Sequence, residues 1–495
     1  QLEATDIAVD NSRMTLAIGE TLQIAMVEKL RVDNLSSLRP DTPATIDLTA
    51  QAADGTIRIQ GQAFPFAELP NLALKMNVAS IDLNALKSLI AAGRIKDIAG
   101  IAALSGDLTA GMSKSGGAAV TYTGSATLSE ASTDTALFRT RSTDLSWNGA
   151  ARIAFASPDS ETDAPPDIRL DGVAAAAAFR FRNKTTGMTL AAETAIFDFS
   201  KTGMTLQTKP AGNSATKVTG HLNARLTGAL LEQRDSGLKV APRRLTIDGN
   251  VDLTLPAKTA AFSALLSGTV DTDALEGTLA SAGIDALSAS GLRLTYDDAR
   301  VEISATGGIS VKANAGLGVT GLKLDAPRFG VSARAGKISG VGQKIAFDRA
   351  DNGAIGLSLS GPFTAEDVTA NGADTRWRAG QKNLSWNGRI AVSGTGGKNG
   401  SSGKLSVAGD AAMSGMTATL NPGDGPNAYG IELQRAELKE LSIEDGRMGM
   451  TTAAFAGMSA SGEAEASSLP QVRLKSLRLS GLVSDDRDGI AVDTL

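Results

Sequence analysis

Apolar and polar residues alternate along most of the chain. The stretch 291–336 shows the alternation most clearly, because apolar side chains recur at every second position in successive short runs. A period of two is typical of β-strands with one apolar face. The clusters DDA at 297–299, TGG at 306–308 and NAG at 314–316 separate the runs, and such residues tolerate the positive φ of tight turns. The pattern predicts antiparallel hairpins built from strand-turn units of roughly ten residues.

This alternation also predicts which side chains share the apolar face. In 72–83 a slip of one residue would bury Lys75 without a partner, so we expect Lys75 and Asn77 to face water. Hairpins over 291–313 would bring Leu294, Ile303 and Val311 side by side, and Glu302 would point outward. The residues predicted to line the apolar face are Leu72, Leu74, Met76, Val78, Leu292, Leu294, Val301, Ile303, Ile309, Val311, Val319, Phe329 and Val331.

One phrase occurs twice. LFRTRSTDLSWNG at 137–149 returns as RWRAGQKNLSWNG at 376–388, and the LSWNG that both copies share holds two of the three tryptophans. A hairpin centred near 142–143 would place Phe138 opposite Trp147, and its copy would place Trp377 opposite Trp386. Such aromatic cross-strand pairs stabilise a sheet. We therefore interpret these tryptophans as structural markers of a repeat and not as residues that stack on a ligand.

A few segments depart from the strand pattern. The spacing of apolar residues in 80–100 predicts a short helix packed on the sheet. The stretch 157–167 has three prolines and no periodicity, and 394–403 is rich in glycine and serine. The predicted organisation is a β segment over 1–156, a linker at 157–167, a continued antiparallel sheet over 168–393, a flexible loop at 394–403 and a final β segment over 404–495.

Composition limits the classes of protein that remain. Aromatic residues make up 4% of the 495 residues and 54 are glycine, which favours a thin architecture over thick cores. The net charge of −5 and the mixed signs argue against nucleic-acid binding. The longest apolar run, 88–104, is interrupted by Arg94, Lys96 and Asp97, too many charges for a membrane span. Because the chain opens on Gln1 without a signal-like start, we expect it to be part of something longer.

Residues for catalysis or metal binding are scarce. The chain has no cysteine, and its single histidine, His221, has no second histidine with which to form a zinc site; we expect a lone exposed strand histidine. The segment 484–495 resembles a calcium loop, but Ser484 and Leu495 replace two oxygen ligands, so an acidic turn is expected. We expect no catalytic residue, no metal and no cofactor, and therefore no enzyme.

One region resembles a known family. The succession PATIDLTAQAADGTIRIQGQAFPFAELPNLALKMNVASIDLNALKSLI at 43–90, LSGDLTA at 104–110 and the unit at 137–149 resemble the AsmA-like family, within the AsmA and TamB superfamily of bacterial envelope proteins. The resemblance implies an elongated, curved antiparallel sheet with an apolar groove. It also implies a periplasmic protein, tethered to the inner membrane by a segment absent from this chain, that carries phospholipid toward the outer membrane with partners at both membranes.

Two functions follow from such a sheet. Small side chains would fill a curled apolar face incompletely, so that the acyl chains of phospholipids could occupy the remainder. The alternative is a structural or adhesive β-solenoid, of the passenger-domain type, whose core is filled by its own side chains. Phospholipid that co-purifies with the chain would favour the first function, and a dry core would favour the second.

Overall fold

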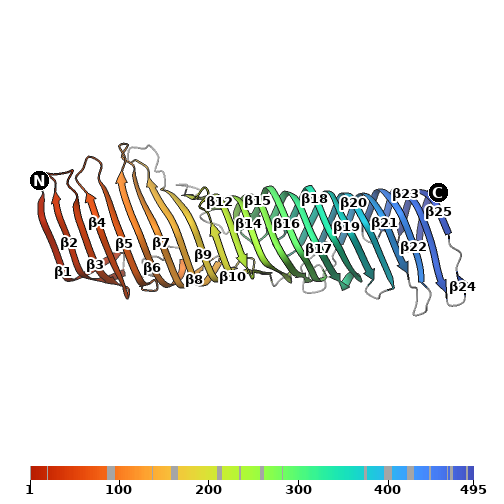
Figure 1. Ribbon diagram of the computed structural model, residues 1–495, viewed down its shortest axis with the longest axis horizontal. Helices are drawn as coiled ribbons and strands as arrows, with labels where there is room; N and C mark the ends of the chain where they lie inside the picture. The colour runs from red at the N-terminus through yellow and green to blue at the C-terminus, as the bar shows by residue number, and fades with distance from the viewer. Residues whose placement is uncertain are drawn as a thin grey trace. The chain divides into compact units, whose positions relative to one another are not determined.

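The structure is a computed structural model of the whole chain. The residues that it describes are 2–18, 21–85, 95–136, 138–157, 166–208, 215–233, 236–256, 261–280, 283–372, 376–394, 404–420, 428–444, 447–464, 467–468, 472–485 and 489–494. The chain divides into two compact units, the first made of Gln1–Gly228 with Asp248–Ser263 and the second of Ala229–Ile247 with Ala264–Leu495. Figure 1 shows the order of the strands along the chain.

The first unit is built from strands that follow one another in chain order. Its strands are β1 (Glu3–Ile18), β2 (Thr21–Ser36), β3 (Ala44–Ala52), β4 (Gly55–Phe64), β5 (Asn71–Asp82), β6 (Ile95–Met112), β7 (Ala118–Thr135), β8 (Phe138–Phe155), β9 (Asp167–Asn183), β10 (Met188–Asp198), β11 (Met204–Thr208) and β12 (Ala215–Thr227). β14 (Leu238–Pro256) and β15 (Phe262–Leu279) have residues in both units.

The second unit contains the remaining elements. They are β13 (Leu230–Gln233), β16 (Ile284–Ile303), β17 (Ile309–Ala326), the short 3-10 helix η2 (Pro327–Phe329), β18 (Val331–Arg349), β19 (Ile355–Gly372), β20 (Trp377–Gly394), β21 (Lys404–Leu420), β22 (Ala428–Glu444), β23 (Arg447–Ala464), β24 (Ser467–Ser468), β25 (Val472–Asp485) and β26 (Gly489–Thr494). No described residue is α-helical.

Neighbouring strands pair antiparallel, which confirms the predicted fold class. From β1 to β9, and again from β16 to β23, each strand pairs with the next one along the chain. The TGG cluster at 306–308 forms the predicted turn between β16 and β17, with Gly307 at φ 98°. Antiparallel pairing through 284–326 excludes parallel coils in that stretch.

The predicted strand length was wrong. β6, β7 and β8 have 18 residues each, and β16 has 20. The DDA cluster lies inside β16, where the register shifts between Asp297 and Arg300 and Asp298 has φ 51°. The NAG cluster lies inside β17, beside a second register shift. The DDA cluster therefore forms a β-bulge, which uses the same turn-forming residues but bends a strand without ending it. The NAG cluster is regular strand, because the extra residue of the second shift lies on β18 between Gly340 and Gln343.

The repeated phrase also forms long strands and not hairpins. Phe138 and Trp147 lie on the single strand β8, so they cannot face one another, and Trp377 and Trp386 lie on β20 in the same way. Each copy starts an 18-residue strand and places its second aromatic residue at the tenth position. The repeat is therefore one strand used twice, with the tryptophan at its middle.

The segments predicted to break the pattern are described only in part. Residues 80–82 belong to β5 and 95–100 to β6, so the ends of the predicted helix are strand, while 86–94 lie outside the described residues. Residues 158–165 of the predicted linker and 395–403 of the predicted loop also lie outside them.

The buried interior consists mainly of small side chains. Among the described residues, eighteen of the twenty-six buried hydrophobic residues are alanine. The eight larger ones are Val27, Ile81, Leu226, Ile303, Val319, Trp386, Leu433 and Leu441. Most large apolar side chains of the described residues therefore remain partly exposed.

Candidate functional site

One face of the first unit carries continuous rows of apolar side chains. Residues directly opposite in an antiparallel register point to the same face. Three such rows cross β5 to β9: Leu72, Ala110, Val120, Ile153 and Ile168; then Leu74, Leu108, Tyr122, Ala151 and Leu170; then Val78, Leu104, Ala126, Trp147 and Ala174. All fifteen residues are half-buried. We call this set the apolar face of the first unit.

The alternation predicted for β5 is present. Leu72, Leu74, Met76 and Val78 are half-buried, and the residues between them, including Lys75, are exposed. The four predicted residues therefore lie on the apolar face, and the lysine lies on the opposite face. The register shifts at Ser80, where φ is 59°, and β5 continues to pair with β6 from Ile81 onward.

A row of glycines crosses the apolar face between the Leu74 row and the Val78 row. Gly106, Gly124, Gly149 and Gly172 lie opposite one another on β6 to β9. A Cβ atom on Gly124 would lie 2.6 Å from the Tyr122 hydroxyl oxygen, so the missing side chain makes room for this ring. The Tyr122 and Trp147 rings approach from the two sides of the row, with centroids 6.0 Å apart. Burial raises the pKa of Tyr122, whose hydroxyl donates to the carbonyl oxygen of Ser125 at 2.8 Å.

The second unit has an apolar face of the same kind. Three of its rows are Ala365, Leu384, Met413, Ala436, Phe455 and Leu477; then Phe363, Trp386, Ala411, Leu438, Ala453 and Leu479; then Leu359, Ile390, Val407, Ile443 and Met448. We call this set the apolar face of the second unit. Trp386, Ala411 and Leu441 form its buried centre, and partly buried leucine, isoleucine and methionine side chains pack around them.

Glycines and an aromatic ring meet here as well. Gly361, Gly388 and Gly409 lie opposite one another on β19 to β21. A Cβ atom on Gly388 or Gly409 would lie 2.8 or 2.9 Å from Cζ2 of Trp386, so this ring lies over both glycines. Phe363 packs against it at a centroid distance of 6.3 Å. The indole N–H groups of Trp147 and Trp386 are both buried and have no hydrogen-bond partner among the described residues.

The remaining predicted lining residues lie on β16 to β18. Leu292 faces Val319, Val301 faces Val311, and Ile303 faces Ile309. Ile303 and Val319 are buried, with 8% and 7% of their surface exposed, and the others of these six are half-buried. Val331 is half-buried opposite Ala326. Phe329 belongs to η2, and its side chain lies outside the described residues.

One predicted contact is wrong. Leu294 and Ile303 lie on the same strand, on either side of the bulge at Asp298, and Leu294 faces Leu317 on β17. Leu294, Ile303 and Val311 are therefore not side by side. Sequence reasoning also missed Tyr122, which packs over glycines of two neighbouring strands, and Phe363, which packs against Trp386. A glycine at the matching place in successive 18-residue strands is the signal that would have located them.

The opposite face of the sheet is polar and charged. In the first unit, Lys29 on β2 lies 2.5 Å from Asp47 on β3, and Arg31 lies 4.0 Å from Asp6 on β1. The hydrogen bond from Lys29 lowers the pKa of Asp47. In the second unit, Lys439 lies 3.4 Å from Asp410. These ion pairs leave the apolar face as the candidate binding surface.

His221 is less isolated than its sequence context indicates. Its Nε2 lies 2.7 Å from Asp248 Oδ1, and its Nδ1 lies 3.1 Å from Asn250 Oδ1. The side chain is 13% exposed, so the prediction of an exposed histidine was wrong. Within the described ranges no three His, Asp or Glu side chains gather into a metal site. The calcium-like segment is described only in part, because 486–488 and Leu495 lie outside those ranges.

Comparisons with protein-family models, curated proteins and solved structures find no match to this chain. Among the described residues, no helix has the length and apolar character needed to cross a membrane.

Proposed function

We propose that the apolar faces bind the acyl chains of phospholipids and that the protein conducts these lipids between the inner and outer membranes of a bacterial envelope. The observation that carries this proposal is the pair of apolar faces, built from rows of half-buried side chains in the first unit and of buried and half-buried side chains in the second, on a sheet whose other face is charged. The chain acts in this proposal as a binding surface and not as an enzyme.

Energetics support a ligand on these faces. Apolar surface left in water costs about 25 cal/mol per Å², so a face made of many half-buried leucine, isoleucine and valine side chains gains free energy when covered. No described residue is α-helical, so no described α-helix covers either face. Acyl chains have the chemistry and the shape to lie along such rows.

Two observations disfavour the solenoid alternative. Strands of a solenoid with parallel coils pair in parallel, whereas every register on β1 to β9 and on β16 to β23 is antiparallel. A self-filled core also buries large side chains, whereas alanine dominates the buried hydrophobic residues of the described ranges. The periplasmic location, the tether to the inner membrane and the partners at both membranes are proposed from the resemblance to the AsmA-like family.

Photo-crosslinking at adjacent residues tests the proposal. A photoreactive residue at Leu74 faces the apolar side of β5, and one at Lys75 faces the opposite side. In cells labelled with radioactive phosphate, we expect lipid crosslinks at 74 and none at 75. Leu384 and Ser385 on β20 form the matched pair in the second unit. Equal labelling at both members of a pair, or labelling at neither, would contradict the proposal.

A further inference from the structure

Four arginines form a square at one end of β8 and β9. Arg139 lies directly opposite Arg182, and Arg141 lies directly opposite Arg180. All four side chains are exposed, and the half-buried Phe138, Phe179 and Phe181 alternate with them along the two strands. Lys184 follows at the turn after β9. We call these five residues the basic array.

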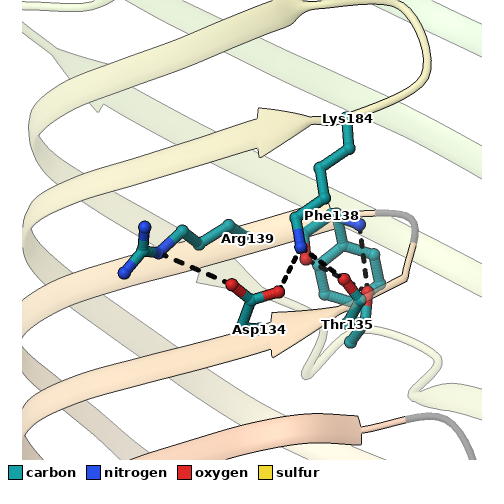
Figure 2. Close-up of polar contacts among 5 residues, drawn as sticks. All are labelled: Asp134, Thr135, Phe138, Arg139 and Lys184. Carbon is teal, nitrogen blue, oxygen red and sulfur yellow. Dashed lines mark hydrogen bonds and ion pairs between the residues drawn. The ribbon is translucent and has the colours of Figure 1, made fainter.

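A single carboxylate lies within the array. Figure 2 shows Lys184 extending from its turn to Asp134, which also faces Arg139. The Lys184 ammonium group donates a second hydrogen bond to the carbonyl oxygen of Thr135 at 2.7 Å, and Arg139 Nε lies 4.0 Å from Asp134. The array therefore holds five positive charges against one negative charge, in a chain whose net charge is −5.

The other three arginines form no ion pair among the described residues. The acidic residues farther along these strands and their neighbours are Glu130 on β7, Asp144 on β8 and Glu193 on β10. None of them lies within ion-pair distance of Arg141 or Arg180. Like charges directly opposite one another destabilise a sheet. The array thus costs stability and leaves guanidinium groups available to an anion from outside the protein.

A second arginine pair on the same two strands provides the contrast. Arg152 lies directly opposite Arg169 near the other end of β8 and β9. Asp167 and Asp171 flank Arg169 at the positions two residues before and after it, so they share its face of the strand. Arg169 also donates to the carbonyl oxygen of Thr202 at 3.1 Å. Two carboxylates on the same strand therefore flank this pair, although neither is ion-paired with it, whereas the arginines of the basic array have no carboxylate two residues away on their own strands.

Aromatic side chains occupy the other face of the same strand ends. Phe138, the first residue of β8, stacks on Phe181 of β9 with centroids 5.8 Å apart. Phe179 meets Phe197 of β10 edge to face at 6.3 Å. Apolar rings and guanidinium groups therefore alternate along FRTR at 138–141 and FRFR at 179–182. An acyl chain on the rings would bring a headgroup to the strand ends, where Arg139, Arg182 and Lys184 lie.

We propose that the basic array binds the phosphate of an anionic phospholipid whose acyl chains lie on the neighbouring phenylalanines. This inference rests on the proposed function, because it assigns the headgroup class of the lipid carried. Guanidinium groups bind phosphate oxygens through paired hydrogen bonds, and their long side chains extend past the end of a strand. The phosphate is the only charged group in the headgroup of phosphatidylglycerol. The headgroup of phosphatidylethanolamine also carries an ammonium group, which the array repels.

Lipid selectivity tests the inference. The purified chain is incubated with vesicles of equal parts phosphatidylglycerol and phosphatidylethanolamine, isolated again, and its bound lipids are quantified by mass spectrometry. With about 1 kcal/mol for each basic residue near an anionic headgroup, we expect phosphatidylglycerol to be enriched about fivefold or more. The double variant Arg139→Gln with Arg182→Gln should bind the two lipids in nearly equal amounts. The matched control Arg152→Gln with Arg169→Gln should keep the enrichment.

The outcomes separate this inference from the proposed function. Bound lipid without enrichment in the unmodified chain, or equal loss of enrichment in both double variants, overturns the inference and leaves the lipid-binding face intact. A chain that holds no lipid of either kind contradicts both this inference and the proposed function.

Inorganic phosphate supplies the same oxygens, so its binding is measured by phosphorus NMR. Saturable binding of inorganic phosphate that the array variant loses, without lipid enrichment, would reassign the array to a soluble anion. The array variant should melt at or above the temperature of the unmodified chain, because it relieves a like-charge pair.

Discussion

Gly388 lies directly opposite Gly409 in the register of β20 and β21, and the Trp386 ring covers both. Neither glycine has room for a side chain, because a Cβ on Gly388 would lie 2.2 Å from the carbonyl oxygen of Ala408, and one on Gly409 would lie 2.5 Å from that of Asn387. The two backbones and the ring are thus packed in direct contact. The same three-part arrangement, two glycines beneath an aromatic ring, occurs at Gly106, Gly124 and Tyr122 in the first unit.

This packing predicts that Gly388→Ala destabilises the second unit. The new methyl group would displace either the β21 backbone or the Trp386 ring, and overpacking of this kind costs about 1–3 kcal/mol. Gly394→Ala on the same strand is the control, because nothing lies within 4 Å of its Cβ position. Thermal unfolding followed by calorimetry should show a lower melting temperature for the first variant only. Equal melting temperatures would contradict the glycine–tryptophan packing.

Substitutions at Trp386 separate its volume from its polarity. The side chain is 6% exposed, and its indole N–H has no hydrogen-bond partner in the part of the chain that the structure describes. Trp386→Ala should therefore cost about 3–5 kcal/mol of unfolding free energy, the usual value for a large buried aromatic residue. Trp386→Phe keeps a ring and removes a buried donor that has no partner, so it should cost less than half as much. Urea unfolding of the two variants measures the difference, and similar losses would indicate that the N–H is bonded after all.

Ile303 and Glu302 provide a second pair of adjacent substitutions. Ile303 is 8% exposed, whereas Glu302 is exposed on the polar face. Ile303→Asp would bury a carboxylate without a partner, at a cost of several kcal/mol, so the variant should lose most of the stability of the second unit. Glu302→Lys should change the unfolding free energy by less than about 0.5 kcal/mol. Circular dichroism during heating distinguishes them, and a silent Ile303→Asp would mean that this position is open to water.

Asp351 links two adjacent turns in a way that depends on pH. Hydrogen bonds from the hydroxyl groups of Thr306, at 2.6 Å, and of Ser304, at 3.1 Å, lower its pKa below the ordinary value of 3.8. Because the folded-state pKa is depressed, the carboxylate adds stability above the unfolded-state pKa, and this stability is lost as the pH falls through the folded-state pKa.

Asp351→Asn should therefore lower the melting temperature at neutral pH, and the difference from the unmodified chain should shrink as the pH falls below 3.8, the ordinary pKa of an aspartate. Asp297→Asn, at an exposed carboxylate inside β16, is the control and should have little effect at either pH. A difference that persists in acid would mean that Asp351 acts through its shape and not through its charge.

The sequence was sufficient to predict strands, their antiparallel pairing and the side of β5 that faces the apolar rows, because alternation is a local property. It was insufficient for strand length. Asp298 adopts the positive φ that a hairpin turn also uses, so the DDA cluster has the composition of a turn although it is a bulge. What distinguishes the two is the partner strand, where Leu317 faces Leu294 and Val311 faces Val301 on either side of the irregularity.

The finer features of the sites depend on pairing between residues far apart in sequence. Arg139 becomes part of a basic array only because Arg182 lies opposite it. Taken alone, neither FRTR at 138–141 nor FRFR at 179–182 differs from an ordinary alternating strand. The same holds for Tyr122, whose ring lies over glycines of two strands. One-residue errors of register would separate all of these partners. The alternation could predict which neighbouring residues of β5 share a face, whereas the grouping of residues from different strands required the register.

The pairing of each strand with the next has a consequence for how the chain is made. Along β1 to β9, and along β16 to β23, a strand needs only its successor to complete a ladder. Loop closure between such neighbours is short, which lowers the entropic cost of each step. The sheet can therefore grow by one strand at a time as the polypeptide emerges from a ribosome or a translocation pore, without waiting for its far end. Until the next strand arrives, the last one presents open hydrogen-bonding groups, so a pause in synthesis leaves an edge that can pair with other chains.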